Sequence, residues 1–270
     1  MNPCISVYLP THNRVELLKR AVSSVQNQDY KDWELIVVND FSTDETSRFL
    51  DKIRKEDKRI IIINNDTPSG ACLSRNKAIS IAKGKYITGL DDDDYFLPNR
   101  LRSFLSDYDE KYAFIAYSHI IKNKDKNKIA LKYSREFTLK DLLKKNYIGN
   151  QIFTETYKIK SVDGFDPNMP AWQDYDLWIR LMLEFGSCLK VNKANYIMDI
   201  GHEEERITTS LKPILAINQF IQKYESLSHD NLAHIKIYKK ILNGEKVSIF
   251  NAIKVIDKDN FAWILKNVFK

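Results

Sequence analysis

Four consecutive aspartates, Asp91 to Asp94, are the feature of this sequence best suited to chemistry. They directly follow the apolar segment 86–90, so a strand would deliver them to one edge of a sheet. Adjacent carboxylates repel one another, and a folded chain tolerates four of them where water or a shared cation offsets the charge. Oxygen ligands favour Mg²⁺ or Mn²⁺, which also bind substrate phosphates. The run indicates a divalent-cation site, or else an acidic loop that caps the helix beginning near Asn99.

Polar residues also follow the first two predicted strands. The first group comes directly after the opening apolar segment, where Thr11, His12, Asn13 and Arg14 follow Pro10. Hydroxyl and amide groups at such a helix start can meet an anion or a nucleobase. Asp40 ends the second apolar segment, where its carboxylate can accept the ring N–H of a base. Both groups are candidates for contact with an anion or a nucleobase.

Arg75 and Asn76 lie near the start of another predicted helix, which follows Ser69-Gly70. The Arg75 guanidinium can pair with a phosphate, or Arg75 can be an ordinary surface arginine. His202 lies in a late loop, where it can ligate a cation, contact a phosphate or simply face solvent.

Asp174 stands at the start of an amphipathic segment, between Gln173 and Tyr175. It can cap the helix, or it can act as a general base, because a carboxylate in partly apolar surroundings can take a proton from a hydroxyl. Trp172 and Tyr175 offer flat aromatic faces on which sugar rings stack.

The elements that must position these residues alternate through the first hundred positions or so. Short apolar segments predict strands over 5–9, 33–38, 60–63 and 86–90, and amphipathic segments predict helices over 16–26, 46–56 and 71–82. This alternation is typical of an α/β fold with a mostly parallel sheet and helices on both faces. Ligands bind such sheets at the carboxyl ends of the strands, where every polar group named above is expected.

Regularity fades after Leu101. A strand over 114–117 and helices over 138–143 and 175–185 are predicted, followed by three or four helical segments from residue 214 onward. We expect one domain over 1–211, with a first half of about 1–100 and a second half of about 101–211. Residues 212–270 then form a small helical C-terminal region.

Composition is that of an ordinary globular protein, with 43% hydrophobic and 29% charged residues. It excludes a disordered, collagen-like or disulfide-stapled chain. The three cysteines are widely separated, no signal peptide is visible, and no apolar run is long enough to cross a bilayer, which together indicate a cytoplasmic location. The net charge of +6 is uneven, because residues 118–160 hold eleven Lys and Arg against four acidic residues. Such a surface can meet an anionic membrane, nucleic acid or a pyrophosphate, or be a solvated lysine-rich face.

Five motifs occur in order and resemble those of the family 2 inverting glycosyltransferases with the GT-A fold, most closely bacterial enzymes that build surface polysaccharides. They are Pro10-Thr11-His12-Asn13-Arg14, Val37-Val38-Asn39-Asp40-Phe41-Ser42-Thr43-Asp44, Ser74-Arg75-Asn76, Leu90-Asp91-Asp92-Asp93-Asp94-Tyr95 and Gln173-Asp174-Tyr175-Asp176-Leu177-Trp178. Each motif is weak alone, but together they form a specific signal over residues 5–210. The resemblance implies a nucleotide-sugar half of about 1–100 and an acceptor half of about 101–211. The C-terminal helical segments fall outside it.

The resemblance implies a role for each matching residue. Thr11 and Asp40 would bind the uracil or ribose of a UDP-sugar, and Arg75 would lie near the pyrophosphate or the base. Asp91 and Asp92 would bind the nucleotide sugar and Asp93 would coordinate Mn²⁺ or Mg²⁺, although the neighbouring aspartates leave that assignment ambiguous by one residue. Pro10, Asn13 and Arg14 would complete the nucleotide site.

On the acceptor side, Asp174 matches the catalytic base of the family, and His202, with Arg206 and Thr208, matches a late segment that closes on metal or diphosphate. Trp172 and Gln173 would contact the acceptor, although Gln173 replaces the acidic residue that commonly precedes the base. The implied acceptor is a lipid-diphosphate-linked saccharide, handled at the inner face of the cytoplasmic membrane.

Two other functions fit parts of the sequence. A sugar nucleotidyltransferase shares the acidic metal chemistry, but it usually carries a glycine-rich phosphate loop that residues 10–14 do not form. A non-catalytic nucleotide or polyanion binder would need no base, so the effect of changing Asp174 distinguishes it. A nucleic-acid partner fits the charge but not an acidic site at the strand ends.

Overall fold

The computed structural model describes residues 3–202, 212–227, 232–248 and 250. The chain divides into two compact units, the first from residues 1–138, 148–167 and 173–204, and the second from 139–147, 168–172 and 205–270. The predicted boundary after residue 211 falls beside residues 203–211, which lie outside the described part of the chain, so it stays a prediction.

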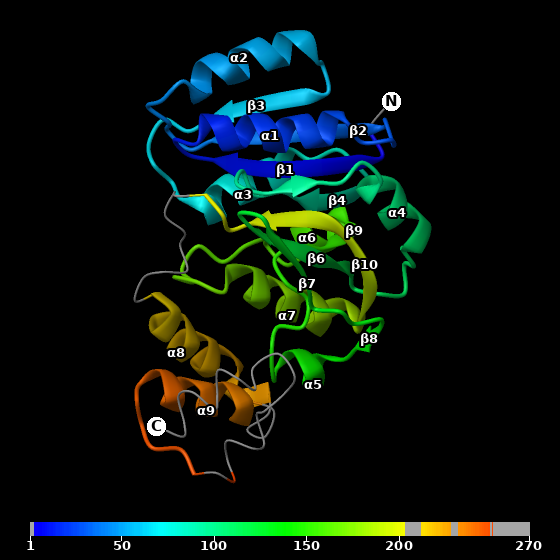
Figure 1. The fold of residues 1–270 in the computed structure, drawn as a ribbon. Coiled ribbons are helices and arrows are strands. Elements are labelled where there is room, and N and C mark those ends of the chain that lie inside the picture. Colours follow the sequence, from blue (N-terminus) through cyan, green and yellow to red (C-terminus); the bar gives the residue numbers. More distant parts are fainter. Residues whose placement is uncertain (1–2, 203–211, 228–231, 249, 251–270) are drawn as a thin grey trace. The chain divides into compact units, whose positions relative to one another are not determined.

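A ten-stranded sheet organises the first unit (Figure 1). Its parallel part has the order β3-β2-β1-β4, formed by β1 (Ile5–Thr11), β2 (Trp33–Asn39), β3 (Ile60–Asn64) and β4 (Tyr86–Gly89). All four strands were predicted. β1, β2 and most of β4 are buried because helices cover both faces of the sheet, whereas β3, at the edge, is only partly buried. Thr11 pairs with Asn39, and Asn39 with Asn64, so the carboxyl ends of three of these strands lie together at one edge.

The second half of the sheet is mixed. β9 (Phe153–Glu155) lies between β4 and β6 (Ile115–Asn123) and is antiparallel to both, and β10 (Cys188–Asp199) runs parallel to β6. The short strands β5 (Tyr95–Phe96) and β8 (Arg135–Phe137) pair with β10, and β7 (Lys126–Ala130) pairs with β6. The sequence analysis found only the start of β6 here. β9 and β10 join the sheet through pairings distant in sequence, whereas β7 returns on β6 as a local hairpin.

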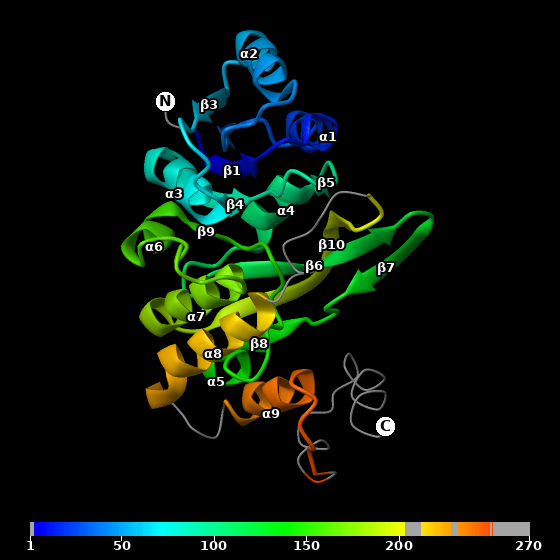
Figure 2. The same cartoon turned by 90° about the vertical axis from the view of Figure 1, so that its left-hand side faces the viewer.

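Helices cover both faces of the sheet, as predicted. Figure 2 shows α1 (Val15–Gln26) and α4 (Arg100–Asp107) on one side, with α3 (Ala71–Ile81), α6 (Thr156–Ser161) and α7 (Gln173–Phe185) on the other. α2 (Thr46–Glu56) packs next to β3. The predicted helices over 16–26, 46–56, 71–82 and 175–185 are confirmed. α7 begins two residues earlier than predicted, so Gln173 and Asp174 lie in its first turn.

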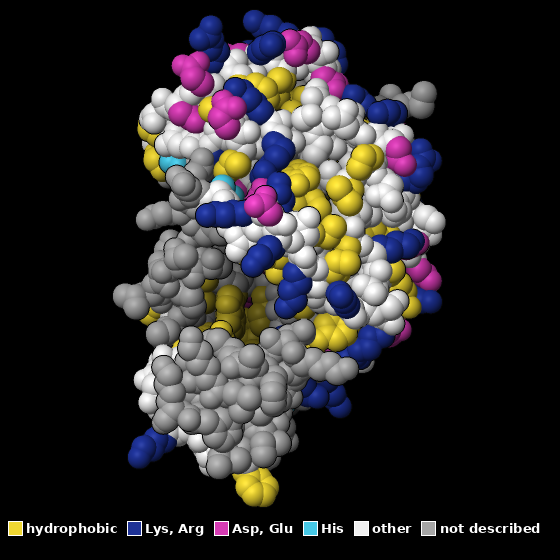
Figure 3. All heavy atoms as spheres, viewed as in Figure 1, with side chains coloured by type: hydrophobic (Ala, Val, Ile, Leu, Met, Phe, Trp, Pro, Cys, Tyr) yellow, Lys and Arg dark blue, Asp and Glu magenta, His cyan; other side chains and the backbone are white. Residues whose placement is uncertain are grey.

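Charged side chains on α2 alternate in sign along the helix surface, as Figure 3 shows at the top of the molecule. Arg48 lies 3.4 Å from Glu45, Arg54 lies 3.1 Å from Asp51, and Lys52 lies 3.9 Å from Glu56. Pairs of this kind on an exposed helix contribute little to stability. This face of α2 is therefore an ordinary solvated surface.

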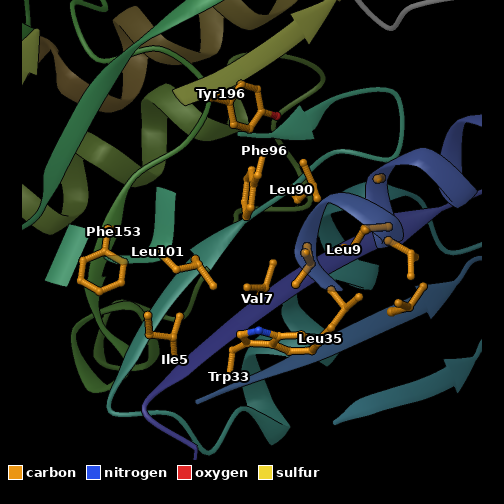
Figure 4. Close-up of a cluster of buried hydrophobic side chains, with 14 of the residues drawn as sticks. Ile5, Val7, Leu9, Trp33, Leu35, Leu90, Phe96, Leu101, Phe153 and Tyr196 are labelled. Carbon is orange, nitrogen blue, oxygen red and sulfur yellow. The ribbon is translucent and has the colours of Figure 1, made fainter. Parts of the chain in front are cut away.

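The core cluster on the α1 side of the sheet is built from alternate residues of the strands (Figure 4). Ile5, Val7 and Leu9 point from β1 into this layer and are fully buried. Trp33 and Leu35 extend the layer over β2, and α1 contributes Leu18, Ala21, Val22 and Val25 at helical spacing. Burial of each large apolar side chain contributes roughly 1.5–3 kcal/mol, so this layer fixes the strand ends that carry the polar residues.

The second unit is helical in its described residues. It contains α5 (Leu139–Leu142), α8 (Lys212–Tyr224), the short 3₁₀ helix η2 (Glu225–Leu227) and α9 (Ala233–Leu242). α8 packs on α9, and Phe220 contacts the rings of Tyr224 and Trp172. The expected helices over 138–143 and from residue 214 are confirmed as far as the description extends, and the segments expected beyond residue 250 lie outside it.

Candidate active site

The acidic run follows β4 directly, at the carboxyl edge of the parallel strands, and is largely buried. Asp92, Asp93 and Asp94 are 6%, 8% and 2% exposed. The expectation that only water or a cation offsets these charges was therefore incomplete. Arginines and hydrogen-bond donors from several elements also surround the run, because buried carboxylates require charged or hydrogen-bonding partners.

Asp91 is held on both oxygens. Arg75 Nη2, on α3, donates to Oδ1 at 2.8 Å. Asn150 Nδ2 and Gln151 Nε2 donate to Oδ2 at 3.3 and 3.2 Å. Arg75 also lies over the ring of Phe165, 5.2 Å from its centre. Arg75 is thus a buried partner of the acidic run and not an ordinary surface arginine.

Asp92 joins the run to the loop after β1. Thr11 Oγ1 donates to Oδ2 at 2.8 Å, and Arg14 Nη1 donates to Oδ1 at 3.2 Å. Burial raises the pKa of Asp92 to about 6, against the lowering effect of Arg14. Two residues predicted to bind the nucleotide, Thr11 and Arg14, are therefore brought to the acidic run.

Asp94 has a structural role. It accepts hydrogen bonds from Tyr196 Oη at 2.6 Å and from the Asp199 amide at 2.9 Å, both on β10. Burial, together with the negative charges of Asp93 and Asp91, raises its pKa well above the usual range. Both Asp94 oxygens are thus engaged by β10, so Asp94 ties the run to that strand.

Asp93 and His202 are the pair best placed to hold a cation. His202 Nε2 lies 3.4 Å from Asp93 Oδ2, and both imidazole nitrogens are buried with no hydrogen-bond partner among the residues that the structure describes. Buried unpaired nitrogens beside a carboxylate suit a divalent cation, and an imidazole ligand favours Mn²⁺ over Mg²⁺. Among the described residues no group of three or more His, Cys, Asp and Glu is arranged around one metal position. A cation here would take its other ligands from water and a diphosphate.

Arg20, on α1, braces the same region. Its guanidinium donates to the Asp93 carbonyl oxygen at 2.5 Å and to Asp199 Oδ2 at 2.6 Å, and it lies over the ring of Tyr95. Burial would raise the pKa of Asp199, but the Gly201 amide and the Arg20 charge hold it below its usual value. This ion pair links the acidic run to the residues that precede His202.

The pKa of Asp174 is set by desolvation and by two neighbouring charges, one positive and one negative. Burial raises the pKa of its carboxyl to about 7, while the Arg75 guanidinium lowers it and the Asp91 carboxylate raises it. Tyr8 of β1 belongs to the same group, since the charges of Arg75, Asp174 and Asp91 all act on its phenol. A carboxyl with a pKa near neutrality is matched to general-base catalysis, and such a shift marks candidate active sites.

The loops after β1 and β2 are interlocked. Asp40 accepts hydrogen bonds from Asn65 Nδ2 and from the Ser69 and Gly70 amides, at 2.7–2.8 Å. Burial would raise its pKa, but these hydrogen bonds lower it overall. Pro10 is buried within β1, and Asn13, with φ of 52°, accepts a bond from the Thr43 amide on Oδ1 at 2.7 Å. Asp40 and Asn13 therefore shape the loop edge beside the acidic run.

The acceptor-side residues are only partly grouped with the acidic run. Gln173 is half-buried in the first turn of α7, and Trp172 is half-buried in the second unit, edge-on to Phe220 at 5.7 Å. Tyr175 is 4% exposed. The expectation that Tyr175 offers a face for sugar stacking is wrong, because its ring points into the core. Arg206 and Thr208 lie outside the described residues.

Sequence reasoning missed several residues of the site, namely Tyr8, Arg20, Asn150, Gln151, Tyr196 and Asp199. Arg20 and Tyr8 lie within a regular helix and strand, where a polar group carries no local signal. Asn150 and Gln151 precede β9, which was itself not predicted. Only knowledge of which strands pair would have drawn attention to them.

Comparison of the sequence with known proteins gives a consistent result. A sequence model described as glycosyl transferase family 2 matches residues 6–163. A relative from Escherichia coli K12, provisionally named colanic acid biosynthesis glycosyl transferase WcaA, is 39% identical over 235 residues, covering 83% of this chain and 82% of the relative. The GalNAc(5)-diNAcBac-PP-undecaprenol beta-1,3-glucosyltransferase of Campylobacter jejuni is 36% identical over 152 residues, covering 56% of this chain and 47% of that protein.

The fold also has a solved counterpart. The crystal structure of residues 1–349 of Staphylococcus aureus TarS, in complex with UDP-GlcNAc, superposes with a TM-score of 0.73 at 18% identity, covering 99% of this chain and 82% of that one. This likeness confirms the predicted GT-A fold, with its central, mostly parallel sheet.

Proposed function

We propose a function that starts from one premise: this chain belongs to glycosyl transferase family 2. The proposed reaction transfers a sugar from a UDP-sugar to a hydroxyl of a lipid-linked saccharide, with inversion at the anomeric carbon. The observation that carries it is the Asp174 carboxyl, half-buried in the first turn of α7, whose pKa desolvation raises to about 7 beside the Arg75–Asp91 ion pair. A site that only binds a nucleotide needs no such base.

Asp174 is the proposed general base. Its carboxylate accepts the proton of the acceptor hydroxyl while that oxygen attacks the anomeric carbon from the face opposite the departing UDP. One displacement inverts the anomeric centre, so an α-linked donor yields a β-linked product. The Arg75 guanidinium keeps part of the Asp174 population ionised near neutral pH, because a nearby positive charge favours the carboxylate.

Asp93 and His202 are the proposed ligands of Mn²⁺ or Mg²⁺. When bound, the cation offsets the negative charge that develops on the departing diphosphate. Thr11, Arg14, Asp91 and Asp92 border the same place, and TarS, a protein with this fold, was crystallised with UDP-GlcNAc. These observations support a nucleoside diphosphate sugar as the donor.

The test is turnover of a panel of UDP-sugars with synthetic saccharides on a lipid diphosphate. We expect one donor to be transferred, with the new linkage of opposite anomeric configuration to the donor, as read from proton coupling constants. Transfer with retained configuration would contradict the single displacement. UDP binding without any transfer would favour the non-catalytic binder.

The acceptor class also has support. The Campylobacter relative is named for a diphosphate-undecaprenol acceptor, which resides in a membrane. Among the described residues, no helix is long and apolar enough to cross a bilayer. We therefore propose peripheral contact with the inner face of the cytoplasmic membrane.

The hairpin of β6 and β7 is the surface that best fits this contact. Its residues 122–132 include five lysines and one aspartate, and residues 123–129 are exposed. β6 ends at the same sheet edge as the acidic run, since Lys122 Nζ lies 3.8 Å from Asp199 and a Cβ on Gly201 would lie 2.6 Å from the Lys124 amide. Figure 2 shows this hairpin extending away from the rest of the sheet.

Replacing Lys124, Lys126 and Lys128 together by Gln is expected to weaken binding to anionic vesicles by about tenfold or more, since each basic residue near such a surface contributes about 1 kcal/mol. Flotation of vesicles with and without anionic lipid measures this. The matched control replaces Lys52, Lys55 and Lys58, on α2 and in the turn after it, by Gln, and so removes the same amount of charge. This variant should bind anionic vesicles as the unmodified protein does. Equal binding by both variants would contradict a docking role for the hairpin.

A further inference from the structure

Two amide side chains donate hydrogen bonds to Asp91, and a buried lysine holds the segment that carries them. Asn150 and Gln151 belong to the segment 148–151, which directly precedes β9, and both donate to Asp91 Oδ2. Asn150 Nδ2 also lies 3.3 Å from Tyr196 Oη and 3.5 Å from Asp94 Oδ2. Gln151 Oε1 lies 3.4 Å from Tyr8 Oη. These two amides thus connect the acidic run to β1 and β10.

The segment 148–151 is fastened by its backbone. Lys190 Nζ, on β10, donates to the Ile148 carbonyl at 2.5 Å and to the Tyr117 carbonyl of β6 at 2.8 Å. Trp178 Nε1, on α7, donates to the Gly149 carbonyl at 2.9 Å. Lys190 is fully buried. One lysine therefore joins the segment to the adjacent strand.

Packing alone does not require a lysine at this position. Burial of an ammonium group is costly, and hydrogen bonds to two carbonyl oxygens offset that cost only in part. Burial also lowers the pKa of Lys190 to about 7. An apolar side chain of similar length would fill the same space without this cost, but it would leave the Ile148 and Tyr117 carbonyls unlinked.

We propose that Lys190, Asn150 and Gln151 are positioning residues of the transfer site. Lys190 holds the segment 148–151 against β6, and the two amides then fix the Asp91 carboxylate so that its other oxygen meets Arg75 and its charge acts on Asp174. This inference rests on the proposed glycosyl transfer, and it gives a role to residues outside all the recognised motifs.

Lys190→Met tests the support, and the chain offers a matched control. Lys158, on α6, is also buried, and its Nζ donates to two backbone carbonyls, those of Glu110 at 3.0 Å and Tyr112 at 2.9 Å. Both Lys→Met variants are expected to have a lower melting temperature. Measured at equal folded fraction, only Lys190→Met should lower kcat, by about tenfold to 100-fold, because misplaced catalytic groups cost about that much.

A double-mutant cycle tests the route through the amides. Asn150→Ala alone should lower kcat about tenfold or more, and adding it to Lys190→Met should lower kcat little further, because both changes release the same carboxylate. Fully additive losses would overturn the inference, as would equal kcat values for the Lys190→Met and Lys158→Met variants. Either result would leave the proposed function intact, whereas absence of transfer by the unmodified chain would count against the function itself.

Discussion

Asp174→Asn is expected to lower kcat by about 10²–10⁴-fold while the affinity for UDP stays close to that of the unmodified protein. The amide keeps the shape of the carboxyl but cannot accept the proton of the acceptor hydroxyl. Steady-state transfer and calorimetric titration of UDP, on the same preparation, separate the two quantities. Unchanged turnover would remove Asp174 from the role of base.

Asp176→Asn is the matched control for that experiment. Asp176 lies two residues further along α7, is fully buried and accepts a hydrogen bond from Arg180 Nε at 2.8 Å. The control should lower the melting temperature, because it weakens a buried ion pair, yet it should leave kcat of the folded protein close to that of the unmodified protein. A similar loss of kcat in both variants would show that disturbing α7 is enough to slow transfer, and it would not support Asp174 as the base.

The pH dependence of transfer gives a second view of Asp174. The base acts only when deprotonated, and burial raises its pKa to about 7, so kcat/KM should rise with pH up to about 7 and then level off. Because the Asp91 charge raises this pKa, Asp91→Asn should move the inflection to lower pH. An inflection near the usual value of a carboxyl in the unmodified protein would contradict a base with a raised pKa.

Asp93→Ala is expected to abolish the metal dependence of UDP binding. In the unmodified protein, calorimetric titration with Mn²⁺ should give clear binding that excess EDTA weakens or removes. In the variant, titrations with Mn²⁺ and with EDTA should agree, because Asp93 faces His202, whose buried ring nitrogens have no other partner among the described residues.

Asp94→Asn is the control within the same run. The Asp94 carboxyl is buried, its pKa is raised well above the usual range, and its oxygens accept bonds from Tyr196 and the Asp199 amide. A neutral amide of the same shape should therefore keep metal-dependent UDP binding. Loss of metal dependence in Asp94→Asn but not in Asp93→Ala would shift the proposed ligand by one position.

The sequence predicts the first half of the fold well because strand and helix alternate locally there. Apolar segments of strand length, each followed by polar residues, place Thr11, Asp40 and Asp91 at the same sheet edge without any knowledge of long-range contacts. What periodicity cannot show is the side chain that each polar residue meets. Arg75 is an example, since its position in α3 is consistent equally with a phosphate, with solvent or with the observed Asp91.

The second half of the chain was harder to predict for a physical reason. β9 has three residues, too few for a periodic pattern, and its partners come from distant parts of the sequence. Lys190 is typical of an exposed position by its residue type, yet it is fully buried, because carbonyl oxygens surround it. Tyr175 was expected to offer its ring to a sugar, whereas only 4% of the residue is exposed.

The place of β9 in the sheet has a consequence for how the chain is made. β9 fills the gap between β4 and β6 but is synthesised after both, and β10 emerges from the ribosome later still. Until then, the nascent βαβ half carries β4 as an open strand edge, ready to pair with another chain. Fragments that stop before residue 153 should therefore aggregate, and fragments that extend through β10 should be far easier to keep in solution.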